Sequence, residues 1–130
     1  MFEAYHADPA VSRTLGKYLV IVDVDIVKNP GGKEMYEKYG TQRGVPAWTV
    51  LDANEKVLAD SGDGKDNVGL PYEPKEIEHY VAVLRKTCPK ISDDEIGALT
   101  KQLKAIAGKK LEELKKAREQ TLRSLKNRTN

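Results

Sequence analysis

The stretch from residue 39 to residue 60 constrains the fold of this chain most, because it joins a proline to two short apolar runs. It reads YGTQRGVPAWTVLDANEKVLAD. Mostly apolar residues at 48–51 and 57–58 flank the polar break DANE, a pattern that predicts a β-hairpin. Pro46 precedes the first strand, where a residue without an amide proton breaks no ladder. Because X-Pro bonds are the peptide bonds that adopt the cis form at low cost, Pro46 can turn the backbone of Val45 outward.

A β-strand is also expected at residues 18–26, which read YLVIVDVDI. So many valines and isoleucines are typical of a strand that is buried on both faces, as parallel strands under crossover helices are. Short helices are expected on either side of it. One starts at Asp8-Pro9, since aspartate caps first-turn amides and proline suits the first helical position, and the other covers residues 33–39. Strand, helix and hairpin in this order predict a mixed sheet with helices on its faces.

Two helical stretches follow the hairpin. From Pro74, apolar residues at 77, 80, 81 and 84 recur at helical spacing until Cys88-Pro89 ends the helix. This spacing places His79 on the polar side. The sequence SDDE at 92–95 is a capping box, and apolar residues at 96, 99, 103 and 106 then mark one face up to Gly108.

Beyond Gly108 the helical pattern thins. Leucines stand at 111, 114, 122 and 125, but Arg118 and Thr121 interrupt them, so we do not expect a long coiled coil. The segment is helix-prone, and its leucines are expected to pack on the body or on a second chain. Residues 101–130 hold 10 Lys and Arg against 3 Asp and Glu, whereas residues 1–100 hold 12 against 17, so the tail is basic and the body acidic.

Charge and composition narrow the range of partners. The basic tail could bind phosphate groups, but no aromatic residues alternate with its charges for base stacking, so a nucleic-acid partner is not expected. No apolar run approaches the ~20 residues that span a bilayer, so no membrane partner is expected either. The start of the sequence lacks the pattern of a signal peptide, and the compartment stays open.

Metal and cofactor sites are not expected. The two histidines, His6 and His79, are too few and too scattered for a metal centre, which needs three or four converging ligands. Residues 60–67 are rich in oxygen ligands, but their spacing fits a calcium loop poorly and no glutamate closes it, so a solvated turn is favoured. The single cysteine, Cys88, is expected to be a small buried group or a neutral surface group. Nearby lysines leave a redox role or an intermolecular disulfide as its alternative.

The motif Gly44-Val45-Pro46-Ala47, followed by a strand and a return strand, resembles the cis-proline loop and hairpin of the thioredoxin-like family. The expected helix, strand, helix and hairpin stand in that family's order, and the resemblance covers residues 1–87. It implies an α/β fold: a thioredoxin-like mixed sheet with flanking helices over residues 1–88, then a helical, basic C-terminal extension over residues 89–130. Gly44, Val45 and Pro46 would bind protein substrates or partners.

One departure from the family decides the expected activity. Family members carry a Cys-x-x-Cys pair, in which one thiolate attacks a substrate disulfide and the second thiol resolves the mixed disulfide. This chain has one cysteine and resembles an N-terminally truncated member without the first core strand and the redox turn. The resemblance therefore implies thiol-disulfide oxidoreduction as the parent activity, but a chain that is inactive as given. The alternative is a redox-inactive binding module that uses the cis-proline loop and the basic tail.

The absent strand has a structural consequence. In the family it lies between the strands that match residues 19–25 and 48–51. Without it, two rows of backbone groups lack partners, and buried backbone groups need them. We therefore expect homo-oligomerisation or exchange of a strand.

Overall fold

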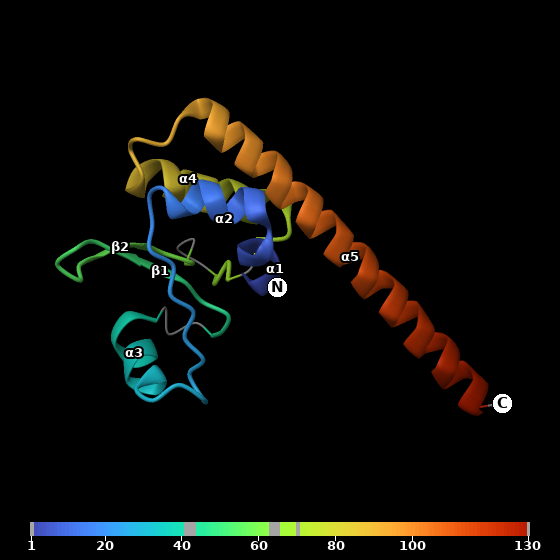
Figure 1. The fold of residues 1–130 in the computed structure, drawn as a ribbon. Helices are drawn as coiled ribbons and strands as arrows, with labels where there is room; N and C mark the ends of the chain where they lie inside the picture. Colours follow the sequence, from blue (N-terminus) through green and yellow to red (C-terminus); the bar gives the residue numbers. More distant parts are fainter. Residues whose placement is uncertain (1, 41–43, 63–65, 70, 130) are drawn as a thin grey trace.

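The computed structural model describes residues 2–40, 44–62, 66–69 and 71–129. Its elements are α1 (Phe2–Ala7), α2 (Pro9–Gly16), α3 (Gly32–Tyr39), β1 (Thr49–Leu51), β2 (Val57–Asp60), α4 (Pro74–Thr87) and α5 (Asp93–Thr129). Figure 1 shows α2, α4 and the first half of α5 in one helical layer, with the hairpin and α3 on one side of it. The second half of α5 extends away from the body. The chain thus combines helices with a small sheet, as expected in outline.

The hydrophobic core lies between α1, α2, α4 and the first half of α5. Its buried side chains are Tyr5, Val11, Leu15, Ile77, Leu84, Cys88, Ile96, Leu99, Leu103 and Ala107. On α5 they recur at intervals of three and four residues, so one stripe of the helix faces the body. The core therefore continues past residue 88, the boundary expected from the sequence, as far as Ala107.

Two predicted helix starts are confirmed. Asp8 Oδ1 accepts hydrogen bonds from the amides of Ala10 and Val11, each at 3.0 Å. At the start of α5, the amide of Glu95 donates to Ser92 Oγ at 3.1 Å, and the amide of Ser92 donates to Glu95 Oε1 at 3.3 Å. These reciprocal bonds form the predicted capping box.

Glu95 also links α5 to the end of α2. The Tyr18 hydroxyl donates to Glu95 Oε1 at 2.6 Å, and Lys17 Nζ lies 3.2 Å from Glu95 Oε2. The hydrogen bond from Tyr18, followed by that from the Ser92 amide, lowers the pKa of Glu95 to about 2. The ionised carboxylate is therefore the form that joins the two helices.

The predicted hairpin is present. β1 and β2 pair antiparallel with one shift in register. In the turn, Asp52 Oδ1 accepts hydrogen bonds from the amides of Asn54 at 2.8 Å and Lys56 at 2.9 Å. An aspartate that bonds to the backbone ahead of it is a common way to close such a turn.

Trp48 attaches the hairpin to α4. Its ring lies 5.4 Å from that of Tyr80 in an edge-to-face arrangement and 5.9 Å from that of His79. The sequence prediction that His79 lies on a polar face is wrong. His79 is half-buried, and its Nε2 lies 3.3 Å from the carbonyl oxygen of Asp60.

The strand predicted at residues 18–26 is wrong for the structure as described. Residues 19–25 belong to no strand, and Val20 and Val22 are 93% and 70% exposed. Among the described residues the sheet has two strands, β1 and β2, so the predicted mixed sheet is not formed. The physical reason is that β propensity reflects packing against neighbours, and no described strand pairs with this segment.

The predicted helix end at Gly108 is also wrong. α5 runs without a break from Asp93 to Thr129. Glycine costs a helix interior only ~1 kcal/mol relative to alanine, and the surrounding Ala, Leu, Lys and Glu are strong helix formers. The leucines beyond Gly108 do not pack on the body, because they are 41–53% exposed.

Candidate functional site

The loop before β1 lies at the surface and contains a cis proline. The Val45-Pro46 bond is cis, as the sequence suggests, and Gly44 has a φ of 109°. Val45 is 60% exposed, and Gly44 and Pro46 are exposed as well. The three predicted binding residues therefore lie together at the surface.

A buried serine and an asparagine hold this loop in place. The Asn67 side-chain amide donates to the carbonyl oxygens of Gly44 at 3.1 Å and Pro46 at 2.9 Å. Ser61, which is fully buried, donates from Oγ to Asn67 Oδ1 at 2.6 Å. Ser61 Oγ also accepts from the amide of Trp48 at 3.3 Å, so the chain of hydrogen bonds runs back to the hairpin.

Two further residues fit closely around the loop. A Cβ added at Gly69 would overlap the carbonyl oxygen of Pro46, so glycine is needed where the chain passes the proline. The Tyr36 hydroxyl donates to the carbonyl oxygen of Gly44 at 3.4 Å. The loop is thus fixed by side chains from α3 and by residues that follow β2.

Sequence reasoning missed these supporting residues. The sequence predicts a solvated turn at residues 60–67. Residues 63–65 of this turn lie outside the described residues. The two ends of that turn form a bridge between Gly62 and Asn67. In the sequence, Ser61 and Asn67 indicate only a turn. Their support of the loop is not visible there, because the backbone groups that they bind, at Trp48 and Pro46, are distant in sequence.

The second part of the candidate site is the segment Val20–Val24, which we call the open segment. Its exposed apolar residues are Val20, Ile21, Val22 and Val24. Val20 and Val22 are the most exposed of these, at 93% and 70%, whereas Ile21 and Val24 are 39% and 38% exposed. Among the described residues, no backbone amide or carbonyl of the open segment has a hydrogen-bond partner. The segment therefore offers free backbone groups together with exposed apolar side chains.

Both ends of the open segment lead into local hydrogen-bonded turns. The amide of Leu19 donates to the carbonyl oxygen of Leu15 at 2.9 Å. At the other end, Asp25 Oδ1 accepts from the amides of Val27 and Lys28, each at 2.9 Å. In Figure 1 the segment runs from α2 across the hairpin in this view to the turn before α3. The open segment therefore lies between two hydrogen-bonded turns.

The remaining predicted site residue, Cys88, lies elsewhere, and the two histidines were not predicted as a site. Cys88 is in the core and 4% exposed, at the C-terminal end of α4. His6 Nδ1 lies 3.5 Å from Asp23 Oδ1. The described residues contain no group of three or more His, Cys, Asp or Glu side chains able to hold a metal ion. The structure thus gives the thiol no direct route to a substrate disulfide.

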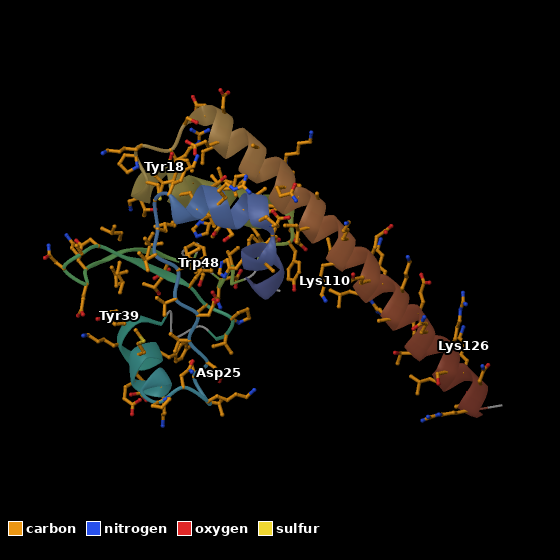
Figure 2. The ribbon with its side chains drawn as sticks, in the orientation of Figure 1. Tyr18, Asp25, Tyr39, Trp48, Lys110 and Lys126 are labelled. Carbon is orange, nitrogen blue, oxygen red and sulfur yellow. The ribbon has the colours of Figure 1, made fainter. Side chains whose placement is uncertain are left out.

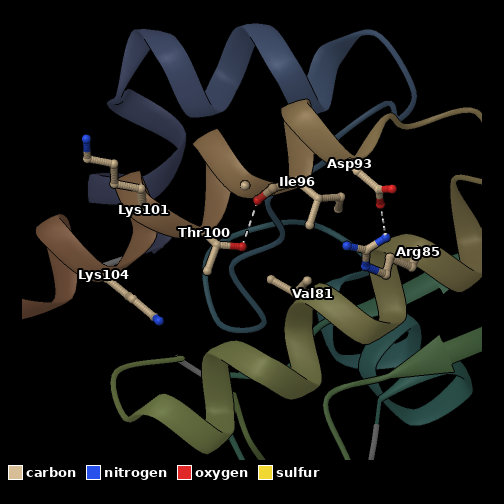
Figure 3. A pocket seen from close by; sticks show the side chains of 8 residues that line it. Val81, Arg85, Asp93, Ile96, Thr100, Lys101 and Lys104 are labelled. Atoms are coloured by element: carbon tan, nitrogen blue, oxygen red, sulfur yellow. Dashed lines mark hydrogen bonds and ion pairs between the residues drawn. The ribbon is translucent and has the colours of Figure 1, made fainter.

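A shallow pocket of about 570 Å³ lies between α4 and α5. Figure 3 shows Arg85 turned toward Asp93, with Nη1 donating to Oδ1 at 2.6 Å. The Thr100 hydroxyl donates to the carbonyl oxygen of Ile96 at 2.7 Å. These polar groups are satisfied within the protein.

Comparisons with known proteins give no relative. No protein-family model, no curated protein and no solved structure matches this chain. Within the part of the chain that the structure describes, no helix combines the length and apolar character needed to cross a membrane. The geometry of the loop and the open segment is therefore the guide to function.

Proposed function

We propose that this chain is a redox-inactive, thioredoxin-like binding module that takes up an extended segment of a partner protein. The site consists of the Val45-Pro46 loop and the open segment. The observation that carries the proposal is the open segment itself, whose valines are exposed and whose backbone groups have no hydrogen-bond partner among the described residues.

Addition of a strand is the binding mode that fits such a segment. A partner strand gains affinity from main-chain hydrogen bonds and specificity from contacts with alternate side chains. Val20 and Val22 favour apolar residues on one side of the partner strand. Asp23, whose side chain is 72% exposed, favours lysine or arginine on the other side of the partner strand, since opposite charges across a strand pair are attractive. The partner is thus an extended segment in which apolar and basic residues alternate.

The absence of a dithiol supports binding rather than catalysis. Thiol-disulfide exchange on a substrate needs an accessible attacking thiolate, and the one cysteine of the chain is buried. The same loop geometry that presents backbone to a substrate serves equally to present it to a partner. Asn67 and Gly69 hold the loop in its present shape.

A peptide selection tests this proposal. A displayed library of random 12-residue peptides is selected on the wild-type protein, and each enriched peptide is then measured by fluorescence anisotropy. We expect enriched peptides with alternating apolar and basic residues. Their Kd should rise at least about tenfold for Val22→Lys, because a charge replaces an apolar contact in the middle of the paired strand.

The matched control is Val57→Lys, which places the same charge on an exposed valine of β2. It should leave the Kd unchanged within about twofold, as expected for a charge outside the paired strand. Two outcomes would overturn the proposal. One is a selection that enriches nothing over background. The other is a set of peptides that bind the two variants and the wild type equally.

A further inference from the structure

The second half of α5 carries an apolar stripe that no described residue of this chain covers. Leu111, Leu114, Leu122 and Leu125 are 41%, 49%, 50% and 53% exposed. Figure 2 shows this part of the helix, between the labelled Lys110 and Lys126, standing clear of the body. At 1.5 Å per residue, the segment from Lys109 to Thr129 is about 30 Å long.

The stripe continues the face that α5 buries against the body. At 100° per residue, the four leucines and Arg118 fall within an arc of about 80°, next to the arc of Leu103 and Ala107. Leu111 and Leu122 are separated by 11 residues, as are Leu114 and Leu125. An 11-residue repeat has 3.67 residues per turn, the period of a right-handed supercoil, so the stripe drifts by only about 20° per repeat around a straight helix.

The order of residues along this stripe is the same in both directions. The spacings from Leu111 through Leu114, Arg118 and Leu122 to Leu125 are three, four, four and three residues. A two-fold axis at Arg118 would therefore bring each leucine opposite a leucine of an antiparallel second copy. Leu111 would face the second copy's Leu125, and Leu114 the second copy's Leu122. A palindromic stripe of this kind is self-complementary, as a two-fold interface requires.

Charges beside the stripe favour the same arrangement. In an antiparallel pair, the same flank of each helix meets across the two-fold axis. One flank carries Glu112, Lys115, Glu119 and Lys126. The symmetry brings Lys115 near the second copy's Glu119, and Glu112 near the second copy's Lys126. Each contact occurs twice, and opposite charges at flanking positions of paired helices select partner and orientation.

The opposite flank is mostly small and neutral, with Ala117, Thr121 and Ser124. A parallel pair would instead place the charged flank of one helix against the neutral flank of the other, without the Lys115–Glu119 attraction. The charge pattern thus distinguishes the antiparallel from the parallel pair.

We propose that residues 109–129 form an antiparallel two-helix interface with a second copy of this chain. At the centre Arg118 lies opposite Arg118 of the second copy, and at each end Lys110 lies near Arg128 of the second copy. Repulsion between these like charges keeps the association weak. Arg118 is therefore the residue that sets the affinity of the dimer. This inference does not depend on the proposed function, since the open segment lies in another part of the fold.

Analytical ultracentrifugation of the full chain tests the interface. We expect a reversible monomer–dimer equilibrium in the wild type. Arg118→Leu should tighten it at least about tenfold, because a leucine replaces the charge at the centre of the stripe. Leu122→Lys in the Arg118→Leu background should weaken it at least about tenfold.

Gln120→Lys in the same background is the matched control, because residue 120 lies on the opposite side of the helix. It should leave the dimer intact. If wild type and Arg118→Leu are both monomers at the highest soluble concentration, the inference is wrong. It is equally wrong if Gln120→Lys and Leu122→Lys have the same effect, or if the tail instead binds a short DNA duplex with the steep salt dependence of phosphate contacts.

Orientation is tested by cross-linking in a Cys88→Ala background. An equimolar mixture of Leu111→Cys and Leu125→Cys chains should form the mixed disulfide under mild oxidation. Either variant alone should stay reduced, because the antiparallel pair holds two identical positions at opposite ends of the interface. Predominant Leu111→Cys homodimers would show a parallel pair and contradict the proposal.

Discussion

The side-chain amide of Asn67 donates to the carbonyl oxygen of Pro46 at 2.9 Å, so a residue from beyond the hairpin fixes the loop that precedes it. The same side chain accepts the hydrogen bond of the buried Ser61 hydroxyl at 2.6 Å. The loop is therefore not a free turn. Its shape depends on residues that approach it only after folding.

Asn67→Ala should destabilise the protein by about 1–3 kcal/mol, the usual cost of leaving a buried hydroxyl such as that of Ser61 without its partner. Urea unfolding followed by circular dichroism measures this change. Asn54→Ala is the control, because the hydrogen bond of Asn54 in the hairpin turn comes from its backbone amide. Equal stability of the two variants would show that Asn67 does not hold the loop.

Gly69→Ala should disturb the cis-proline loop, because its Cβ would overlap the carbonyl oxygen of Pro46. We expect a lower unfolding midpoint and changed amide chemical shifts at Val45 and Ala47. Gly108→Ala serves as the comparison. It meets nothing within 4 Å in the middle of α5 and should stabilise the helix by about 0.5–1 kcal/mol. A neutral Gly69→Ala variant with unchanged shifts would contradict the described packing.

Stability should fall in acid through Glu95. Its folded pKa is lowered to about 2, chiefly by the Tyr18 hydroxyl, whereas an unfolded glutamate titrates near 4.3. The folded state holds fewer protons between these values. The contribution of Glu95 is therefore complete above the unfolded pKa and is lost as pH falls toward 2.

Thermal melts at pH 7 and pH 3 check this prediction. Glu95→Gln and Tyr18→Phe should both reduce the difference in Tm between the two pH values, whereas Glu78→Gln, at an exposed position of α4, should not. If the difference in Tm is the same in all three variants, Glu95 does not cause the loss of stability in acid.

Reduction of insulin disulfides by dithiothreitol should be no faster with this protein than in buffer. The chain has one cysteine, and Cys88 is 4% exposed. Exchange through a single buried thiol lacks both the accessible attacking thiolate and the resolving group. Turbidity at 650 nm measures the rate. Acceleration that disappears in Cys88→Ala would contradict the redox-inactive assignment.

Local signals predicted much of the secondary structure. The helix from Pro74 and the hairpin are where their patterns place them, because capping, proline and turn residues act over a few positions. The strand predicted at residues 18–26 is not formed, for the opposite reason. A strand forms only with a neighbour, and the Val and Ile content of a segment does not reveal whether that neighbour is present.

The candidate site shows the same division. Gly44, Val45 and Pro46 were found from a local motif, and the bond before Pro46 is cis. Ser61, Asn67 and Gly69 were not found, since each acts on a backbone group that lies 13 or more positions away. The continuity of α5 was also missed, because Gly108 is a stop signal in the sequence but meets no steric obstacle in the helix.

Hydrogen exchange at the amides of Val20 to Val24 tests the central claim most directly. These amides should exchange at nearly unprotected rates in the free protein, because they donate to no described residue. On addition of a saturating peptide from the selection, alternate amides should become protected at least about tenfold, since alternate groups of a strand pair with its neighbour. Protection already present in the free protein, or no change at any of these amides in the complex, would contradict a strand-binding site.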